Sequence, residues 1–431
     1  MNKYIIQKKL FNFYCLYDVF MMYFLGKMSP KIQRYIQNVR LRKLIRKAYR
    51  NPFYRKRFDK AGIKPKDIKT REDLKKLPSL SKAEYREWMQ NELNNPQVRF
   101  FHLTHTSGST GIPATNIFPP REYATHYIMD MFCWIKGGYN PFLGKTMTCA
   151  PGDINVGTHL FVQKLGILRR KCFCMKWDRE KIINEINNYK PDFLLGYSAE
   201  LVYIAQYALE NNIPVHKPRY YCAGGEHVIG EPEQILKTVF GDGMINYYGC
   251  TEMADFASRL PNADGYEVNE CWIALNVITD KGIKSSGEGR ILATPLYRTH
   301  YPLINYEIGD IVVLTQKDGL DYISDVYGRE QDIFYWKSGK QTTHKDIWLV
   351  SRELEDIYQI KFIQESFSMV TIQVVKDKKS LRSNKELERY LLKKYEKLFD
   401  NNVTISFEWL PEIPPDPNGK IRNMISKIRG K

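Results

Sequence analysis

The sequence predicts an α/β protein with a large N-terminal domain and a small C-terminal domain. Two apolar runs typical of buried strands, 145–150 and 193–196, alternate with two helical patterns, 178–189 and 200–211. This alternation is typical of parallel strands joined by helices. Beyond about residue 264 the helical patterns give way to β-rich runs broken by glycine. A chain of 431 residues is long enough for two or three domains.

The N-terminal segment is strongly basic. Residues 1–60 hold 16 lysine and arginine residues against two acids, Asp18 and Asp59, and contribute +14 of the formal net charge of +17. The rest of the chain is therefore close to neutral. This distribution argues against a nucleic-acid-binding face on the folded body.

Helical patterns fill most of this segment. Residues 10–25 form an apolar run of 16 residues that is interrupted by Asp18 and is shorter than the roughly 20 residues needed to span a bilayer. No small-residue cleavage site of a signal peptide follows it. The run is either a helix that packs on the body or one that lies in an anionic membrane surface. Residues 32–54 predict a helix with one basic face, ended by Asn51-Pro52.

The remaining elements follow the same pattern analysis. Short capped helices are expected at 71–76 and 82–91, and β-rich runs at 272–280, 289–295 and 310–315. From Gly328 a smaller α+β unit follows, with helices at 345–358 and 384–399 and strands at 369–375 and 403–409. We expect three regions, namely a basic helical segment 1–60 packed on the large domain, the remainder of that domain at 61–327, and a small domain at 328–431.

The cysteines indicate a reducing environment. Eight are scattered through the chain without the paired spacing of a disulfide scaffold. We therefore expect a cytoplasmic protein, with peripheral contact at the inner face of the membrane as a further option. Cys172 and Cys174 alternate with apolar residues in a strand pattern, which favours packing over metal binding.

One loop has the composition of a phosphate-binding site. Between Leu103 and Pro113 the sequence is rich in hydroxyl-bearing residues and glycine, so its backbone N–H groups and hydroxyls can surround a phosphate chain. It lacks the residue order of a Walker loop. Alone, such a turn is more often an ordinary loop.

Four further segments give this loop a context. In chain order they are 247–252 (YYGCTE), 304–310 (INYEIGD), 328–332 (GREQD) and 417–422 (PNGKIR). Together the five segments resemble the signature motifs of the adenylate-forming enzymes, the superfamily of acyl-CoA synthetases, adenylation domains and luciferases. Residues 41–88 resemble the N-terminal region of the phenylacetate-CoA ligase branch, which includes relatives found with capsular polysaccharide genes. The resemblance implies an ATP- and acyl-binding domain with parallel-rich sheets and a β-rich subdomain, followed by a small mobile C-terminal domain.

The resemblance also implies roles for individual residues. The loop that would hold the β- and γ-phosphates of ATP consists of Thr106, Ser107, Gly108, Ser109, Thr110 and Gly111. Tyr248, followed by Gly249, would stack on the adenine, and Thr251 would bind the α-phosphate. Glu252 would bind Mg²⁺ through a hard oxygen ligand.

The other implied nucleotide contacts lie later in the chain. Asp310 would accept hydrogen bonds from the ribose hydroxyls, and Arg329 would assist from the domain junction. Gly225 and Glu226 would form an adenine-side turn, although a plain strand-end turn is also possible. Lys420 would bridge the attacking carboxylate and the nucleotide, a task suited to a cation on a long side chain.

The acyl pocket and two departures from the family pattern remain open. By analogy Trp134, Tyr197 and Gly224 would line a pocket for an aryl or medium-sized acid. Gln331 stands where the family often has an acidic hinge residue. Asn305 stands where the branch usually has arginine, which indicates either a different substrate or an altered surface contact.

The activity expected from the resemblance is ATP-dependent ligation of a carboxylic acid. The acid and ATP would form an acyl-adenylate and pyrophosphate with Mg²⁺, and the acyl group would pass to a thiol, first of all coenzyme A. A phosphopantetheine arm on an acidic carrier protein, or an amine or hydroxyl of a polysaccharide precursor, are alternative acceptors. A non-catalytic, membrane-associated scaffold on the same fold is the alternative of another class, and no nucleic acid is expected as a partner.

Overall fold

A computed structural model describes residues 3–105, 114–150, 161–174, 177–224, 231–351, 354, 356–378, 380–414 and 422–428. The chain divides into two compact units. The first unit comprises Met1–Gly144, His159–Arg169 and Ile245–Asp325, and the second comprises Lys145–Thr158, Arg170–Met244 and Val326–Lys431.

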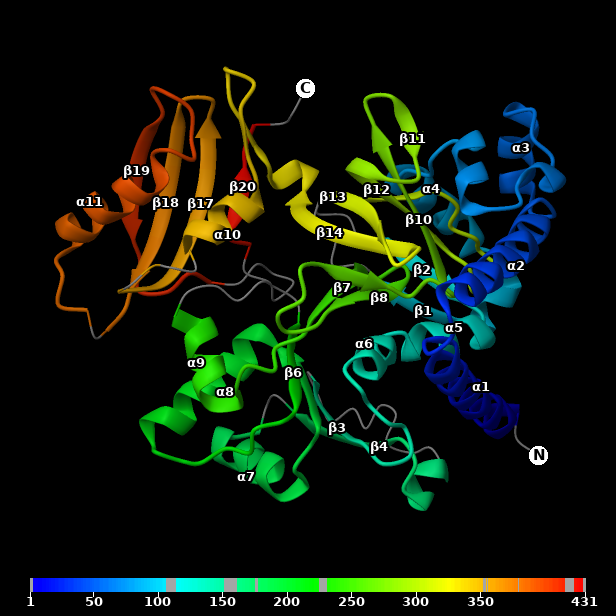
Figure 1. Ribbon diagram of the computed structural model, residues 1–431, viewed down its shortest axis with the longest axis horizontal. Helices are drawn as coiled ribbons and strands as arrows, with labels where there is room; N and C mark the ends of the chain where they lie inside the picture. Colours follow the sequence, from blue (N-terminus) through cyan, green and yellow to red (C-terminus); the bar gives the residue numbers. More distant parts are fainter. Residues whose placement is uncertain are drawn as a thin grey trace. The chain divides into compact units, whose positions relative to one another are not determined.

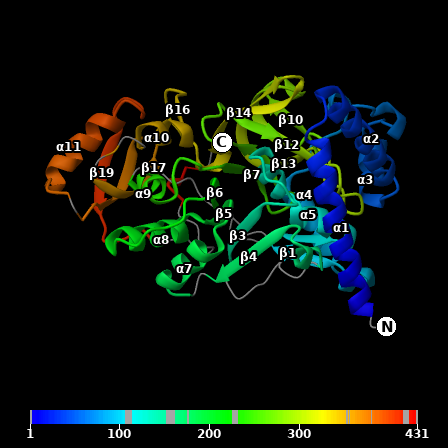
Figure 2. The ribbon, with the colours of Figure 1, turned by 60° about the horizontal axis from the view of Figure 1, so that its bottom comes forward.

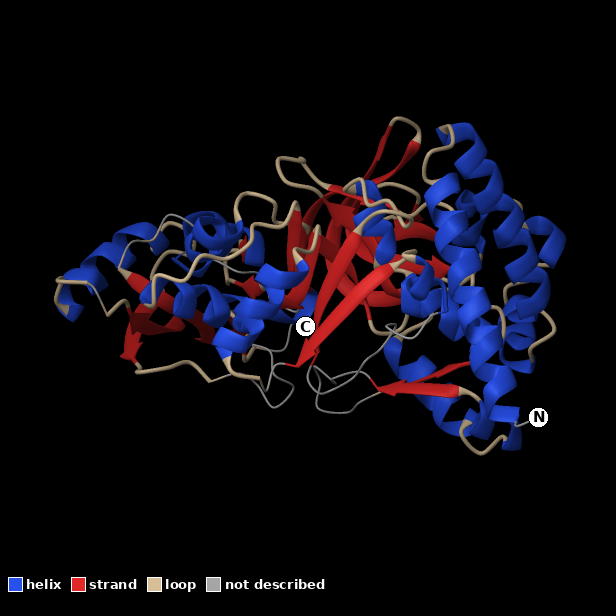
Figure 3. Ribbon diagram, turned by 90° about the horizontal axis from the view of Figure 1, so that it is seen from below, coloured by secondary structure: helices blue, strands red, loops and turns tan. Residues whose placement is uncertain are grey.

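The first unit begins with helices. They are α1 (Lys3–Leu25), α2 (Pro30–Ala48), α3 (Pro52–Lys60), α4 (Lys82–Glu92), α5 (Pro120–Ile128) and α6 (Met131–Lys136), with short 3₁₀ turns at η1 (Pro65–Asp67), η2 (Arg71–Lys76) and η3 (Pro96–Phe100). Helix α1 lies beside α5 (Figure 1), and the helices near the N-terminus form one group (Figure 3). Within the described residues, no helix combines the length and apolar character that crossing a membrane requires.

Local sequence explains how two of these helices begin. At the start of α4, Ser81 and Glu84 form a reciprocal capping box, which satisfies backbone N–H groups of the first turn. The helix expected from residue 32 ends just before Asn51-Pro52, as predicted, but the pattern did not indicate that a second helix starts at Pro52. α2 ends at Ala48, and α3 begins at Pro52, with the Asn51 side chain accepting a hydrogen bond from the backbone N–H of Phe53. Proline cannot continue a helix but is well suited to the first turn of one. Pro52 therefore prevents α2 from continuing and also starts α3.

Two sheets belong to this unit. A hairpin joins β1 (His102–His105) and β2 (Thr115–Phe118). The larger sheet has the order β11-β10-β12-β13-β14-β9-β8-β7. Its strands are β7 (Asn246–Cys250), β8 (Ala254–Arg259), β9 (Tyr266–Val268), β10 (Ile273–Thr279), β11 (Gly282–Lys284), β12 (Gly287–Pro295), β13 (Tyr306–Lys317) and β14 (Leu320–Arg329).

The second unit begins with the predicted parallel sheet. Its order is β4-β3-β5-β6, and β3 pairs in parallel with β5, as β5 does with β6. The strands are β3 (Lys145–Ala150), β4 (Arg169–Cys174), β5 (Phe193–Tyr197) and β6 (Tyr220–Gly224), and the helices are α7 (Arg179–Tyr189), α8 (Ser198–Glu210) and α9 (Glu231–Phe240). Figure 2 shows α7 and α8 beside this sheet. Side chains such as Ile186, Leu194 and Leu201 form its apolar core.

The C-terminal part of the second unit is an α+β sandwich. Its sheet has the order β19-β18-β17-β20, with β17 (Ile357–Ser366), β18 (Met369–Lys376), β19 (Thr404–Trp409) and β20 (Met424–Ser426). The same region holds the β15 (Phe334–Tyr335) and β16 (Gln341–Thr342) hairpin, the η5 turn (Glu330–Asp332), and the helices α10 (His344–Ser351) and α11 (Asn384–Tyr395). The helix expected over 345–358 is therefore too long. Residues from Ile357 onward form a strand whose alternate side chains Ile360 and Phe362 are buried.

His126 in α5 gives the first unit a pH dependence of known sign. Its ring lies 4.4 Å from the Phe118 ring, and burial, together with the nearby Arg298 and His102, lowers the pKa of His126 to about 3. The unfolded chain binds this proton near pH 6.5, so stability is complete above about pH 6.5 and falls as the pH drops toward 3. We expect wild-type protein to lose about 1 kcal/mol more than His126→Gln between pH 7.5 and 5.5, measured by urea unfolding. His105→Gln, at an exposed position, is the control, and equal losses in wild type and His126→Gln would contradict this assignment.

Candidate active site

Two tyrosine–carboxylate pairs form the centre of the candidate site. The hydroxyl of Tyr248 on β7 donates a hydrogen bond of 2.9 Å to Oδ2 of Asp310 on β13. The hydroxyl of Tyr306, also on β13, donates one of 2.6 Å to Oε1 of Glu252, just after β7. All four residues are buried. The predicted residues Tyr248, Glu252 and Asp310 are thus brought together in the first unit.

Strand β13 places Tyr306 and Asp310 on the same face of the sheet. Its side chains alternate between buried and partly buried positions, with Tyr306 and Asp310 among the buried ones. Residues four apart in a strand point to the same face. In the sheet order, β14, β9 and β8 separate β13 from β7. The two side-chain bonds therefore mean that the sheet curls until β7 faces β13.

Arg298 holds the backbone of Glu252. Its guanidinium group is fully buried and donates a hydrogen bond of 2.8 Å from Nη1 to the carbonyl oxygen of Glu252. It also donates to the Tyr85 hydroxyl at 3.3 Å and to the Ile117 carbonyl at 3.3 Å. The Tyr85 hydroxyl in turn donates to Oδ1 of Asn116 at 2.7 Å. The turn after β7 is therefore anchored to α4 and β2.

At Gly249, near the end of strand β7, a side chain would not fit. The β7–β8 register shifts between Tyr248 and Gly249. A Cβ atom on Gly249 would lie 2.2 Å from the carbonyl oxygen of Ala254 and 2.5 Å from the Cα atom of Asp255. Both are backbone atoms, so a side chain would force the strands apart. This close approach sets the direction in which Tyr248 leaves the strand.

The two other residues of this turn differ in exposure and chemistry. Thr251 is exposed, so its hydroxyl is accessible to a ligand. Burial and the neighbouring Glu252 carboxylate raise the pKa of the Cys250 thiol well above its ordinary value. A thiol with a raised pKa is a poor nucleophile. The site thus offers oxygen donors and acceptors rather than a reactive sulfur.

The predicted acyl-pocket residues fall in both units. Trp134 on α6 is buried in the first unit, and its indole N–H donates a hydrogen bond to the hydroxyl of Tyr247 on β7. Tyr197 and Gly224 lie in the second unit, where they are register partners at the ends of the parallel strands β5 and β6. The structure therefore brings Tyr197 and Gly224 together and places Trp134 beside β7.

The remaining predicted site residues lie away from the two tyrosine–carboxylate pairs in the chain or outside the described residues. Arg329 lies at the end of β14, in the second unit, and Gln331 lies in η5. The phosphate loop residues Thr106 to Gly111, the turn residues Gly225 and Glu226, and Lys420 lie outside the described residues. Their roles stay predictions.

Asn305 has a structural role that the sequence did not indicate. Its side chain is fully buried, and Nδ2 donates hydrogen bonds to the carbonyls of Leu74 at 2.8 Å and Leu77 at 3.1 Å. Its backbone is left-handed, with φ of 51°, a conformation that asparagine tolerates better than most residues. The altered-surface-contact alternative is therefore wrong, because Asn305 ties the segment before α4 to the start of β13.

The Glu252 carboxylate has the donor chemistry that a magnesium ion would need, with phosphate and water as further ligands. Among the residues that the structure describes, no three histidine, cysteine, aspartate or glutamate side chains converge as a metal cluster. Mg²⁺ is commonly held by one or two carboxylates, with substrate phosphates and water as the remaining ligands. The single Glu252 carboxylate, with one oxygen fixed by Tyr306, fits that arrangement.

Two important residues were missed by the sequence analysis. Tyr306 lies inside the 304–310 segment, and its spacing of four from Asp310 in a strand pattern places both on one face. That spacing could have identified it. Arg298 lies in a segment without a motif, and nothing in its local sequence indicates that it is buried against Glu252.

Comparison with known proteins extends these observations. The family model of the CapK C-terminal domain matches residues 334–427. Protein CapK of Staphylococcus aureus is 27% identical over 258 residues, which cover 57% of this chain and 55% of CapK. The match thus spans about half the length of CapK. A phenylacetate-coenzyme A ligase of Escherichia coli (strain K12) is 34% identical over 303 residues, covering 65% of this chain and 66% of the ligase.

The fold has close counterparts among solved structures. One is 2-hydroxyisobutyryl-CoA ligase in the postadenylation state with R3-HIB-AMP, with a TM-score of 0.73, 18% identity, and coverage of 93% of this chain and 90% of the ligase. The chain is a homologue of CapK and the phenylacetate-CoA ligases, with the fold of the adenylate-forming enzymes. The family resemblance and the fold class predicted from the motifs are confirmed. In this CapK-like chain, the CapK C-terminal domain match covers the sandwich of β17–β20 and α11.

The buried contacts of Asn305 predict a loss of stability. We expect Asn305→Ala to lower the free energy of unfolding by about 2–4 kcal/mol, because two buried carbonyls lose their donor and alanine disfavours the left-handed backbone. Asn305→Gly removes the same hydrogen bonds but tolerates the backbone, so it should cost about 1 kcal/mol less. Denaturant unfolding measures both.

Asn262 supplies the matched control. It is exposed and also left-handed, with φ of 64°, so Asn262→Ala should cost only about 1 kcal/mol, the price of the backbone conformation. A loss in Asn305→Ala no larger than that in Asn262→Ala would show that the buried hydrogen bonds contribute nothing.

Proposed function

We propose that the protein is an ATP-dependent carboxylic acid ligase that forms an acyl-adenylate and then an acyl thioester, with coenzyme A as the acceptor. The observation that carries the proposal is the joining of Tyr248, Asp310, Glu252 and Tyr306 by two hydrogen bonds at the end of β7. The homology to phenylacetate-CoA ligases supports the reaction class. The adenylate named for the structural neighbour supports the intermediate.

In the first half-reaction, a carboxylate oxygen attacks the α-phosphorus of ATP. The new O–P bond replaces the bond to the β-phosphate, and pyrophosphate leaves. Asp310 accepts hydrogen bonds from the ribose, Tyr248 stacks on the adenine, and the exposed Thr251 contacts the α-phosphate. Glu252 would hold Mg²⁺, which would supply neutralisation of the phosphate charge, and the Lys420 ammonium group would stabilise the attacking and transferring oxygens. Positioning and charge neutralisation account for most of the catalysis in this class of transfer.

In the second half-reaction, the thiol sulfur attacks the acyl carbon. The C–S bond forms, the C–O bond to AMP breaks, and the thiol proton is released. A phosphopantetheine arm of a carrier protein presents the same thiol, and an amine or hydroxyl of a polysaccharide precursor would attack in the same way.

The proposal predicts carboxylate-dependent exchange of pyrophosphate into ATP. We expect exchange with one class in a panel of aryl, aliphatic, hydroxy and amino acids, and a loss of at least about 100-fold in Lys420→Ala because a cation that stabilises the transition state is removed. Lys427→Ala is the control, since Lys427 pairs with Glu365 at 2.6 Å. Exchange by Lys420→Ala at the wild-type rate would contradict the role of Lys420. Silence across the panel in folded protein would favour the non-catalytic scaffold.

The hydrogen bond from Tyr306 to Glu252 leads to a prediction about the magnesium dependence of pyrophosphate exchange. Tyr306→Phe removes the hydrogen bond that orients Glu252, a bond to a charged group worth about 1.5–3 kcal/mol. We expect the Mg²⁺ concentration for half-maximal exchange to rise about tenfold, with a much smaller change at saturating Mg²⁺. Tyr301→Phe, which removes a 3.2 Å bond to Glu92, is the matched control. Equal Mg²⁺ dependence in the two variants would contradict this role.

A further inference from the structure

Helix α1 has two apolar faces with different surroundings. One face is buried on the first unit through Cys15, Val19 and Met22, and α1 contacts α5. The opposite face exposes four large apolar side chains. They are Leu10, Phe13, Tyr17 and Phe24, which are 46%, 62%, 49% and 53% exposed. Their spacing of three, four and seven residues places them on one stripe of the helix. The helix therefore packs on the body and still presents an apolar stripe to its surroundings.

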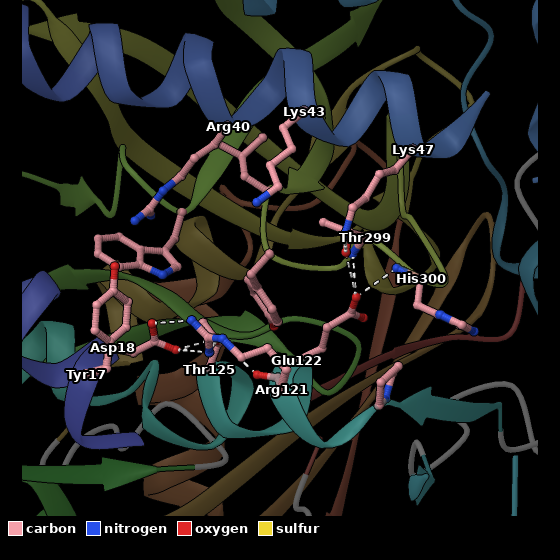
Figure 4. Close-up of a pocket in the computed structure, with 14 residues that line it drawn as sticks. Tyr17, Asp18, Arg40, Lys43, Lys47, Arg121, Glu122, Thr125, Thr299 and His300 are labelled. Carbon is pink, nitrogen blue, oxygen red and sulfur yellow. Dashed lines mark hydrogen bonds and ion pairs between the residues drawn. The ribbon is translucent and has the colours of Figure 1, made fainter. Parts of the chain in front are cut away.

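A row of cations follows one face of the neighbouring helix α2. Arg40, Lys43 and Lys47 recur at spacings of three and four, so they lie above one another on that face. Figure 4 shows the three side chains extending from α2 toward the same cavity. Among the described residues, no carboxylate lies within ion-pair distance of any of them. Like charges at this spacing repel, and an anion between them would remove that cost.

The cavity below this row has a volume of about 420 Å³ and is lined by residues from α1, α2, α5 and the segment 296–300. Its two acidic side chains already have partners. Asp18 forms a two-pronged ion pair with Arg121. Oε1 of Glu122 accepts hydrogen bonds of 2.7 Å from the backbone N–H groups of Thr299 and His300, and burial raises the pKa of its carboxyl. The cavity therefore keeps an excess of positive charge.

The positive charge of Arg40 is likewise not neutralised by an ion pair within the described residues. Its guanidinium group lies 4.0 Å from the Trp272 ring, and Nη1 donates a hydrogen bond of 2.8 Å to the Cys271 carbonyl. These hydrogen-bonding and ring partners are neutral, burial lowers the pKa of Arg40, and the Asp18 carboxylate acts on Arg40 only through space. A partly buried cation with neutral partners gains most from an anion.

We propose that the cavity between α2 and α5 binds the phosphate of an anionic membrane lipid, while the apolar stripe of α1 enters the lipid surface beside it. Tyr17 joins the two features, because it belongs to the exposed stripe and also lines the cavity. A free phosphate compound would need the cations alone. The adjacent stripe of exposed aromatic and aliphatic side chains is what favours a lipid, since this combination is typical of helices that lie in a membrane surface. The proposal concerns a site separate from the tyrosine–carboxylate pairs and does not depend on the ligase activity.

Flotation of the full-length protein with vesicles tests the proposal. We expect binding to vesicles of 70% phosphatidylcholine and 30% phosphatidylglycerol, and none to vesicles of phosphatidylcholine alone. In Lys43→Glu/Lys47→Glu the partition coefficient should fall at least about tenfold, because each basic residue near an anionic surface contributes substantially to binding. Lys31→Glu/Arg46→Glu makes the same change in net charge on other faces of α2 and should fall far less. Equal falls in the two double variants would overturn the site, as would failure of the wild type to bind.

A second pair of variants in the same flotation experiment tests the apolar stripe of α1. Phe13→Ser/Phe24→Ser should also lose binding at least about tenfold, whereas Leu381→Ser, which removes a fully exposed leucine in the second unit, should not. Glycerol 3-phosphate, compared with sodium chloride at equal ionic strength, separates the sources of phosphate. Saturable binding of glycerol 3-phosphate by protein that ignores the vesicles would assign the cavity to a soluble phosphate and overturn the lipid. Circular dichroism and urea unfolding of each variant verify that the fold is intact.

Discussion

The fully buried guanidinium group of Arg298 is the interaction on which the candidate site depends. It binds the backbone of Glu252, the hydroxyl of Tyr85 and the carbonyl of Ile117, and so joins the turn after β7 to α4 and β2. Its carbon Cζ lies 4.4 Å from the Phe118 ring. Because a buried cation is costly without hydrogen-bond acceptors, the acceptors that surround the two Nη atoms restrict how these elements can pack. The hydrogen bonds of the buried Arg298 side chain thus fix the position of the Glu252 backbone.

The curled sheet supplies the second constraint. Strand β13 presents Tyr306 and Asp310 on one face, and the register shift at Gly249 turns Tyr248 toward them. Each carboxylate then receives a hydrogen bond from a tyrosine on the opposite strand. Side chains that are oriented before a ligand arrives lose little entropy when it binds, which would suit the nucleotide alignment that we propose.

The sequence predicted elements best where one signal decided them. The apolar run 145–150 coincides with β3, and the alternation of strands and helices predicted the parallel sheet. It missed the start of α3, because Pro52 both ends one helical pattern and begins the next helix. It also extended the helix of α10 into residues that form the strand from Ile357. The motifs located Tyr248, Glu252 and Asp310 because each lies in a contiguous segment. Arg298 and the Asn305 contacts join residues far apart in the chain, and only the tertiary structure brings these partners together.

The central claim is that the pair of Tyr248 and Asp310 belongs to a nucleotide site, and calorimetric titration with AMP tests it most directly. The account predicts that Asp310→Asn, which keeps the shape of the side chain but removes its charge, raises the Kd for AMP at least about tenfold. Asp264→Asn, at an exposed aspartate that pairs with Lys317, should leave the Kd unchanged. Equal AMP affinity in wild type and folded Asp310→Asn would contradict the account.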